Sequence, residues 1–193
     1  MRQRALGIGL AWVAAFAAAG CTGDPEPVDD GGSARTGGGV VLKAYPVAGD
    51  WTPMGSPLKY SANADDLDPY VGESRGAQLR ANTLDSLLVK QYAHEDWDKP
   101  TGGPGDRKDI RRIRVELFLH QMSVGAGRTF QNWHSGKSIN DLGEKAFAES
   151  DAITFLRGSV LVRLVPTGPW IPGDAAKPTV QVGKAIDAWL QGK

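Results

Sequence analysis

Cysteine and histidine are scarce in this sequence of 193 residues, which has one cysteine, Cys21, and three histidines. A single cysteine excludes an internal disulfide, so the fold must be stabilised by packing. Charge of one sign is not in excess either, because 22 Lys and Arg balance 22 Asp and Glu. We therefore expect no nucleic acid as a partner. No apolar run reaches the roughly 20 residues of a membrane span.

The start of the sequence has the order of a secretion signal. Arg2 and Arg4 precede a short apolar stretch over residues 5–19, and Gly20 and Cys21 follow it. A basic start, a short apolar stretch and small residues before a cleavage site are typical of a signal peptide. Residues 18–21 resemble the lipobox of bacterial lipoproteins, which implies cleavage before Cys21 and acylation of its thiol and new N-terminus. A plain signal peptide and a membrane span are the alternatives.

Three regions follow from this interpretation. Residues 1–20 are expected to be a lipoprotein signal peptide, and residues 21–39, rich in Gly, Pro and Asp, a flexible tether. Residues 40–193 are long enough for a single domain with a sizeable core. We expect an extracytoplasmic protein held at the membrane through lipid on Cys21. The resemblance implies the outer membrane if the host has one, because Thr22 replaces the aspartate that retains such proteins at the inner membrane.

Alternating apolar side chains predict several strands in the domain. Residues 113–119 read IRVELFL, which predicts a strand with one buried face and with Arg114 and Glu116 on the other. Residues 153–165 predict two strands joined by a turn at Arg157-Gly158, and residues 84–92 predict a further strand. Helices are expected over residues 66–80, 123–133 and 178–190. This order predicts an α+β domain whose mainly antiparallel sheet carries helices on one face.

Short pieces spread over residues 45–165 resemble an uncharacterised family of bacterial secreted proteins. The pieces are Tyr45-Pro46 with Trp51, the run LDPYVGE at 67–73 for the family's L-x-x-Y-(I/V)-x-G helix, the runs 115–118 and 121–123, and the runs 142–147 and 158–163. The resemblance implies an extracytoplasmic domain of this fold class. It transfers no catalytic residue, because the family has no established activity.

The residue types that usually carry catalysis form no recognisable motif. His94, His120 and His134 share no helical ligand spacing, and no serine lies in a G-x-S-x-G elbow. The G-K-S run at 136–138 lacks the first glycine of a phosphate loop, because Gln131 stands at that position. The acids at 65–68 are expected to favour a helix start rather than to do acid/base work. We therefore expect no metal and no cofactor.

Two loop tryptophans are the candidate binding residues. Trp97 and Trp170 lie in segments rich in Pro and Gly, where exposure to a ligand is plausible, although loop aromatics often pin a loop to the core. The sequence thus favours a lipid-anchored module of the cell envelope that binds a small ligand or an envelope protein without catalysis. The alternatives are an envelope hydrolase with a dispersed site such as His94, His120 and Asp66, and a structural subunit of an envelope assembly.

Overall fold

The structure is a computed structural model that describes residues 34–35, 41–42, 44–94, 111–168, 170 and 175–192. The expected signal peptide 1–20, the lipidation site Cys21 and Trp97 lie outside these residues. Of the expected tether, only β1 (Ala34–Arg35) is described, and it pairs with β2 (Val41–Leu42) as a small antiparallel sheet.

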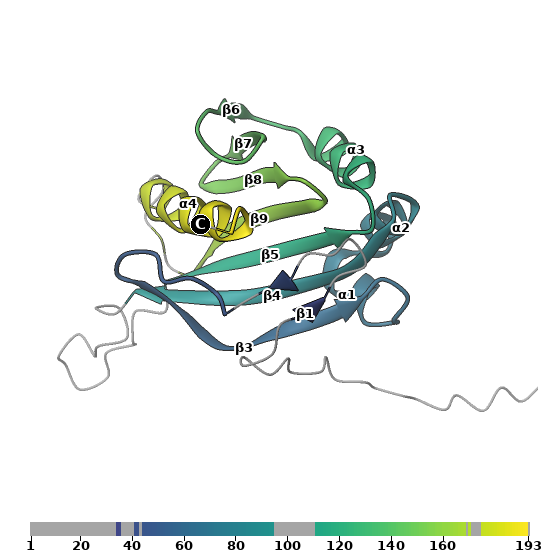
Figure 1. The fold of residues 1–193 in the computed structure, drawn as a ribbon, viewed down its shortest axis with the longest axis horizontal. Coiled ribbons are helices and arrows are strands. Elements are labelled where there is room, and N and C mark those ends of the chain that lie inside the picture. The colour runs from purple at the N-terminus through teal and green to yellow at the C-terminus, as the bar shows by residue number, and fades with distance from the viewer. Residues whose placement is uncertain are drawn as a thin grey trace, which may run out of the picture.

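One antiparallel sheet of seven strands forms the centre of the fold, in the order β3-β4-β5-β9-β8-β7-β6 (Figure 1). Its strands are β3 (Trp51–Ser61), β4 (Leu84–His94), β5 (Arg112–His120), β6 (Lys137–Ile139), β7 (Lys145–Glu149), β8 (Ala152–Arg157) and β9 (Val160–Thr167). Two meanders, β3-β4-β5 and β6-β7-β8-β9, meet where β9 pairs with β5. The predicted α+β class and antiparallel sheet are confirmed.

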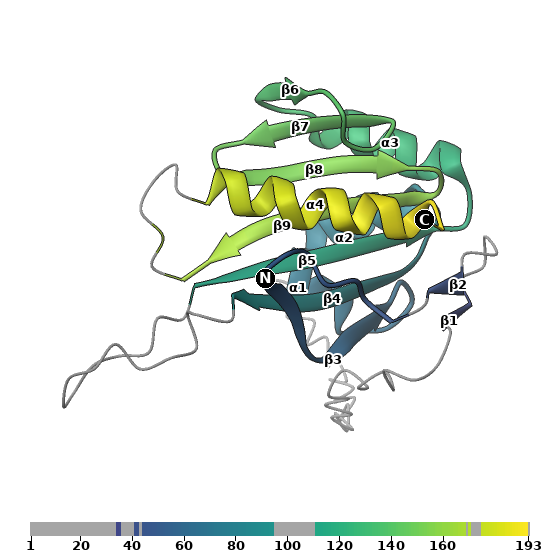
Figure 2. The same ribbon diagram turned by 60° about the vertical axis from the view of Figure 1, so that its left-hand side comes forward.

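Helices cover both faces of the sheet rather than the single face that was expected. The helices are α1 (Leu67–Val71), α2 (Glu73–Ala81), α3 (Ser123–Trp133) and α4 (Ala176–Leu190). Figure 2 shows α4 in front of the sheet, with α1, α2 and α3 behind it. Val182 and Ile186 of α4 lie in one apolar cluster with Leu117. Leu79 of α2 and Phe130 of α3 lie in the other cluster, with Phe118.

The second helix layer explains why much of the second face of β5, which was predicted to face solvent, is buried. Phe118 alternates with Leu117 and Leu119, so its side chain points to the opposite face, where α3 covers it. Glu116 points to that same face and is only 2% exposed. The prediction of a single buried face was therefore wrong, because periodicity of two distinguishes the faces but does not show which of them is covered.

Several predicted element ends are displaced by local backbone geometry. The helix expected over 66–80 is split into α1 and α2 at Gly72, whose φ of 90° and ψ of 140° interrupt it. Asp66 occupies the N-cap position of α1 and makes no side-chain cap hydrogen bond. The last hairpin turns at Gly158 and the residue after it rather than at Arg157-Gly158, since Arg157 still pairs with Val160.

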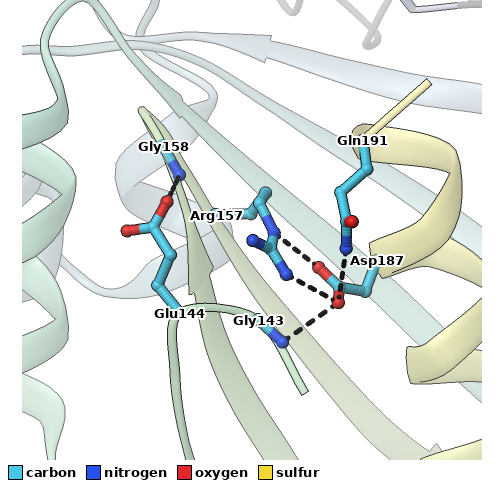
Figure 3. Close-up of polar contacts among 6 residues, drawn as sticks. All are labelled: Gly143, Glu144, Arg157, Gly158, Asp187 and Gln191. Atoms are coloured by element: carbon cyan, nitrogen blue, oxygen red, sulfur yellow. Dashed lines mark hydrogen bonds and ion pairs between the residues drawn. The ribbon is translucent and has the colours of Figure 1, made fainter. Parts of the chain in front are cut away.

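An ion pair between Arg157 and Asp187 holds the C-terminal half of α4 against the sheet (Figure 3). Arg157 donates from Nε to Oδ1 of Asp187 at 2.7 Å and from Nη2 to Oδ2 at 2.8 Å. The backbone N–H of Gly143 and the side-chain amide of Gln191 also donate to Oδ2, each at 3.1 Å. A bidentate pair with two further donors fixes both position and orientation, so we interpret this carboxylate as structural.

Candidate functional site

The residues proposed for a dispersed hydrolase site are not brought together. His94 is the last residue of β4, whereas His120 is the last residue of β5 and pairs with Leu84 at the other end of β4. Ten positions of an extended strand separate Leu84 from His94, which corresponds to about 33 Å. The alternative of a hydrolase site that contains both His94 and His120 does not fit this fold, because the antiparallel pairing places them at opposite ends of the sheet.

Each histidine instead has a packing role. His120 is 1% exposed, and its Nδ1 lies 2.7 Å from the backbone oxygen of Asn82. Burial lowers the pKa of His120, which favours a neutral ring that donates from Nδ1 to this oxygen. The ring of His134 packs edge-on against Phe147, with centroids 5.0 Å apart. Within the described ranges, no three His, Cys, Asp or Glu side chains form a group that could hold a metal ion.

The acids at 65–68 contribute to local structure. Arg80 of α2 donates from Nη2 to Oδ2 of Asp68 at 2.8 Å, so the ion pair connects α2 to α1. The hydrogen bond from Arg80 lowers the pKa of Asp68, which keeps this carboxylate ionised. Asp66 lies at the start of α1 and influences Tyr60 of β3 electrostatically.

Trp170 lies against the core. Its ring stacks on Trp51, with centroids 6.0 Å apart and planes 18° apart. Its indole N–H is shared between the backbone oxygens of Thr167 at 3.1 Å and Arg112 at 3.3 Å. Trp170 is also only half-exposed. These contacts favour the alternative in which this tryptophan pins its segment to the sheet.

A cluster of charged side chains lies on the face of the sheet opposite α4 and is the most unusual arrangement among the described residues. We call Tyr70, Arg114, Glu116 and Arg163 the Glu116 cluster. Tyr70 donates from its hydroxyl to Oε1 of Glu116 at 2.8 Å, and Arg163 donates from Nη1 to Oε2 at 3.3 Å. Nε of Arg114 lies 2.8 Å from Oε1 but without hydrogen-bond geometry, so this contact is an ion pair. A buried carboxylate is thus held by three side chains from α1, β5 and β9.

Strand pairing and α1 create the cluster. Glu116 of β5 lies directly opposite Arg163 of β9, and Arg114 is two residues before Glu116 on the same face. Tyr70 comes from α1, and its ring stacks on Tyr60 of β3 with centroids 4.6 Å apart. The guanidinium carbon of Arg114 lies 5.7 Å from the centroid of the Tyr70 ring, a cation–π distance.

The cluster lies where the cover of helices ends. Figure 1 shows α1, α2 and α3 gathered toward one end of the sheet, the end at which β5 leads into α3. There the second face carries the apolar side chains of Leu87, Phe118 and Leu161. Toward the other end of the strands, the side chains of Arg114 and Arg163 are 29% and 27% exposed, although that of Glu116 is only 3% exposed. The carboxylate is therefore buried, while both arginine side chains are partly exposed to solvent.

The arrangement is suited to binding rather than to proton transfer. Burial, followed by the charge of Glu116, raises the pKa of Tyr70 well above its usual range, so its phenol stays protonated and acts as a donor. Arginine is always charged and cannot act as a base at ordinary pH. What the cluster presents to solvent is therefore a pair of cationic donors with fixed positions.

The sequence contains a sign of this cluster that the alternation of apolar and polar residues does not reveal. Arg114, Glu116 and Arg163 are charged residues inside strands that are otherwise apolar. Arg114 and Glu116 were interpreted as solvent-facing because their side chains alternate with buried ones. Only the register between β5 and β9 shows that Glu116 and Arg163 face each other.

Comparisons with protein families, curated proteins and solved structures find no match to this chain. Along the described parts of the chain, none of the helices has the length and apolar character that crossing a membrane requires.

Proposed function

We propose that this chain is a lipid-anchored protein of the cell envelope that binds a ligand or partner through the Glu116 cluster and does not catalyse a reaction. The anchoring part of the proposal is supported by Cys21 in its lipobox-like setting and by the tether that follows it. Thr22 supports the outer membrane as the destination in a host that has one. A tethered domain of this kind acts on molecules at or near the membrane surface.

The observation that carries the binding part is the asymmetry of the cluster. One carboxylate, which is almost completely buried, holds two arginine side chains that are each more than a quarter exposed. Burying an ionised group is unfavourable unless it is fully paired, so the sheet gains little stability from Glu116 that an apolar residue would not provide. An arrangement that orients two exposed arginines is better explained by recognition of something outside the chain.

Complementation of a host deletion strain tests this function. Full-length protein with Arg114→Gln and Arg163→Gln should reach the membrane at normal level yet fail to restore the wild-type phenotype. Arg128→Gln is the matched control, since Arg128 is an exposed arginine on α3 and outside the cluster. Normal complementation by the double variant would contradict a role of the cluster in binding.

A further inference from the structure

We infer that the ligand of the Glu116 cluster is an anionic amphiphile, a small molecule in which a carboxylate or phosphate group is joined to an apolar chain. This inference rests on the proposed function, because it names the class of ligand for the same surface. The anionic group would lie on Arg114 and Arg163, and the apolar chain would extend across β4 to Leu58 and Met54 of β3.

The number of charges at the cluster favours an anion. Two guanidinium groups face one carboxylate, and the neighbours across the strands, Val89 and Gln91 of β4 and Thr154 of β8, carry no charge. Asp66, an acid outside the cluster, influences Tyr60 electrostatically, as Arg114 and Glu116 also do. One positive charge is therefore not balanced within the cluster itself.

Donors are available for this anion. A guanidinium group has five N–H donors, and within the described residues Arg163 uses Nη1 alone for Glu116. Arg114 directs Nε toward Glu116 and has no further hydrogen bond there. The other N–H groups of both side chains remain for solvent or for a ligand. Guanidinium groups bind carboxylate and phosphate oxygens in pairs of parallel hydrogen bonds, which fixes the ligand as well as attracting it.

An apolar strip lies beside these donors on the same face. The pairing places Glu116 opposite Val89, and Val89 opposite Leu58. In the next row, Arg114 is opposite Gln91, and Gln91 is opposite Met54. Leu58 and Met54 are 38% and 36% exposed, so both belong to the few large apolar side chains of the described residues that are exposed. Two strand spacings, about 10 Å, separate β5 from β3, so one small molecule can reach both features.

An NMR titration of the purified domain tests this inference, with probes that share an eight-carbon chain and differ in their headgroups. Octanoate and octyl phosphate should shift the Nε–H signals of Arg114 and Arg163 and the methyl signal of Met54, with saturation. Octanol should bind much more weakly, and octyltrimethylammonium should not shift the arginine signals. A preference between octanoate and octyl phosphate would identify the headgroup.

Three variants and one control variant separate the two ends of the ligand. Arg163→Gln should weaken octanoate binding roughly tenfold or more, the equivalent of one charged hydrogen bond, and Arg128→Gln should not. Arg163→Lys retains the charge but not the planar set of guanidinium donors, and it should give an intermediate loss of octanoate affinity. It replaces Arg163→Gln in the test if the Gln variant folds poorly. Leu58→Ser alters an exposed residue and should weaken octanoate but not acetate.

The results that would overturn the inference are distinct from those that would overturn the proposed function. Equal binding of octanol and octanoate, or unchanged octanoate binding in a folded Arg163→Gln, would exclude an anionic headgroup at the cluster. Equal binding of acetate and octanoate would exclude the apolar part. Any of these results, combined with failure of the arginine double variant to complement, would leave the binding function in place with a ligand of another class.

Discussion

Glu116 is the residue on which the account depends most. It is an ionisable side chain, 2% exposed, in the middle of β5, where the neighbouring positions 115 and 117 are fully buried. Its carboxylate is compensated from three directions, by Tyr70, Arg114 and Arg163. These partners come from α1, β5 and β9. The burial of the charged carboxylate is therefore compensated only when the sheet and α1 have assembled.

Removal of the Tyr70 hydroxyl tests the strength of this compensation. Tyr70→Phe should lower the free energy of unfolding by about 1.5–3 kcal/mol, because a hydrogen bond to a charged, buried acceptor is lost. Tyr60→Phe is the matched control, since Tyr60 stacks on Tyr70, whereas the hydrogen bond to Glu116 comes from the hydroxyl of Tyr70. Urea unfolding of both variants measures the difference, and equal stabilities would show that Glu116 does not need the phenol.

The pH dependence of stability should depend on His120. Burial lowers its pKa in the folded state, so below the unfolded value of about 6.5 the unfolded chain binds more protons than the folded one. The stability contributed by the neutral, buried ring is therefore complete above that pH and is lost progressively as the pH falls below it. His120→Gln should make the unfolding free energy less dependent on pH in this range. The same slope in both proteins would show that His120 is not desolvated.

At the level of elements, the strands that were predicted are those with clear alternation. β5, β8 and β9 alternate or consist of β-branched and apolar residues, so periodicity was sufficient to find them. β3 was missed because Pro53, Gly55 and Pro57 interrupt it and only a few of its residues are buried. β6 has three residues and β7 has five, which is too short for a periodicity to be recognised.

The beginning of α3 shows how tertiary contacts override helix propensity. Gly125 and Gly127 weaken the sequence signal for this helix. A Cβ on Gly125 would lie 2.1 Å from the backbone oxygen of Asn82, so the glycine allows α3 to approach the turn between α2 and β4. Asn82 then donates from its side chain to Thr129 of α3 at 3.1 Å. A close approach of this kind has no signature in the local sequence.

The turn between β8 and β9 gives a prediction at this scale. Gly158 has a φ of 57°, and a Cβ placed on it would meet no atom within 4 Å. Gly158→Val should therefore lower the free energy of unfolding by about 1–3 kcal/mol through backbone strain alone. Gly127→Ala is the control, because Gly127 lies in α3 with open space around it and should gain stability. Thermal melts that coincide for wild type and Gly158→Val would contradict the assigned turn.

For the whole molecule, the fold class was predictable but the arrangement of layers and the site were not. The order of helices and strands indicated an α+β domain with an antiparallel sheet, which is confirmed. Helices on both faces could not be inferred, because α1, α2 and α3 have no sequence signal for the face they cover. The Glu116 cluster requires both the β5–β9 register and the position of α1, so it becomes visible only in the complete fold.

The lipid anchor is a prediction about the molecule in its cell. Cys21→Ser should leave the precursor uncleaved or release the protein from the membrane fraction, since the only thiol that can be acylated is removed. Attachment by lipid gains about 0.8 kcal/mol per buried CH₂, so several acyl chains are expected for stable anchoring. Cell fractionation with immunoblotting measures both outcomes. A processed Cys21→Ser protein that remains with the membranes would contradict the anchor.

Native mass spectrometry of the full-length protein, extracted gently from host membranes, tests the central claim most directly. The wild-type protein should carry a noncovalently bound mass, and this mass should be retained by Arg128→Gln and lost from the folded Arg114→Gln, Arg163→Gln double variant. An identical bound mass in the double variant, or no bound mass in the wild-type protein, would contradict the claim that the Glu116 cluster is a binding site.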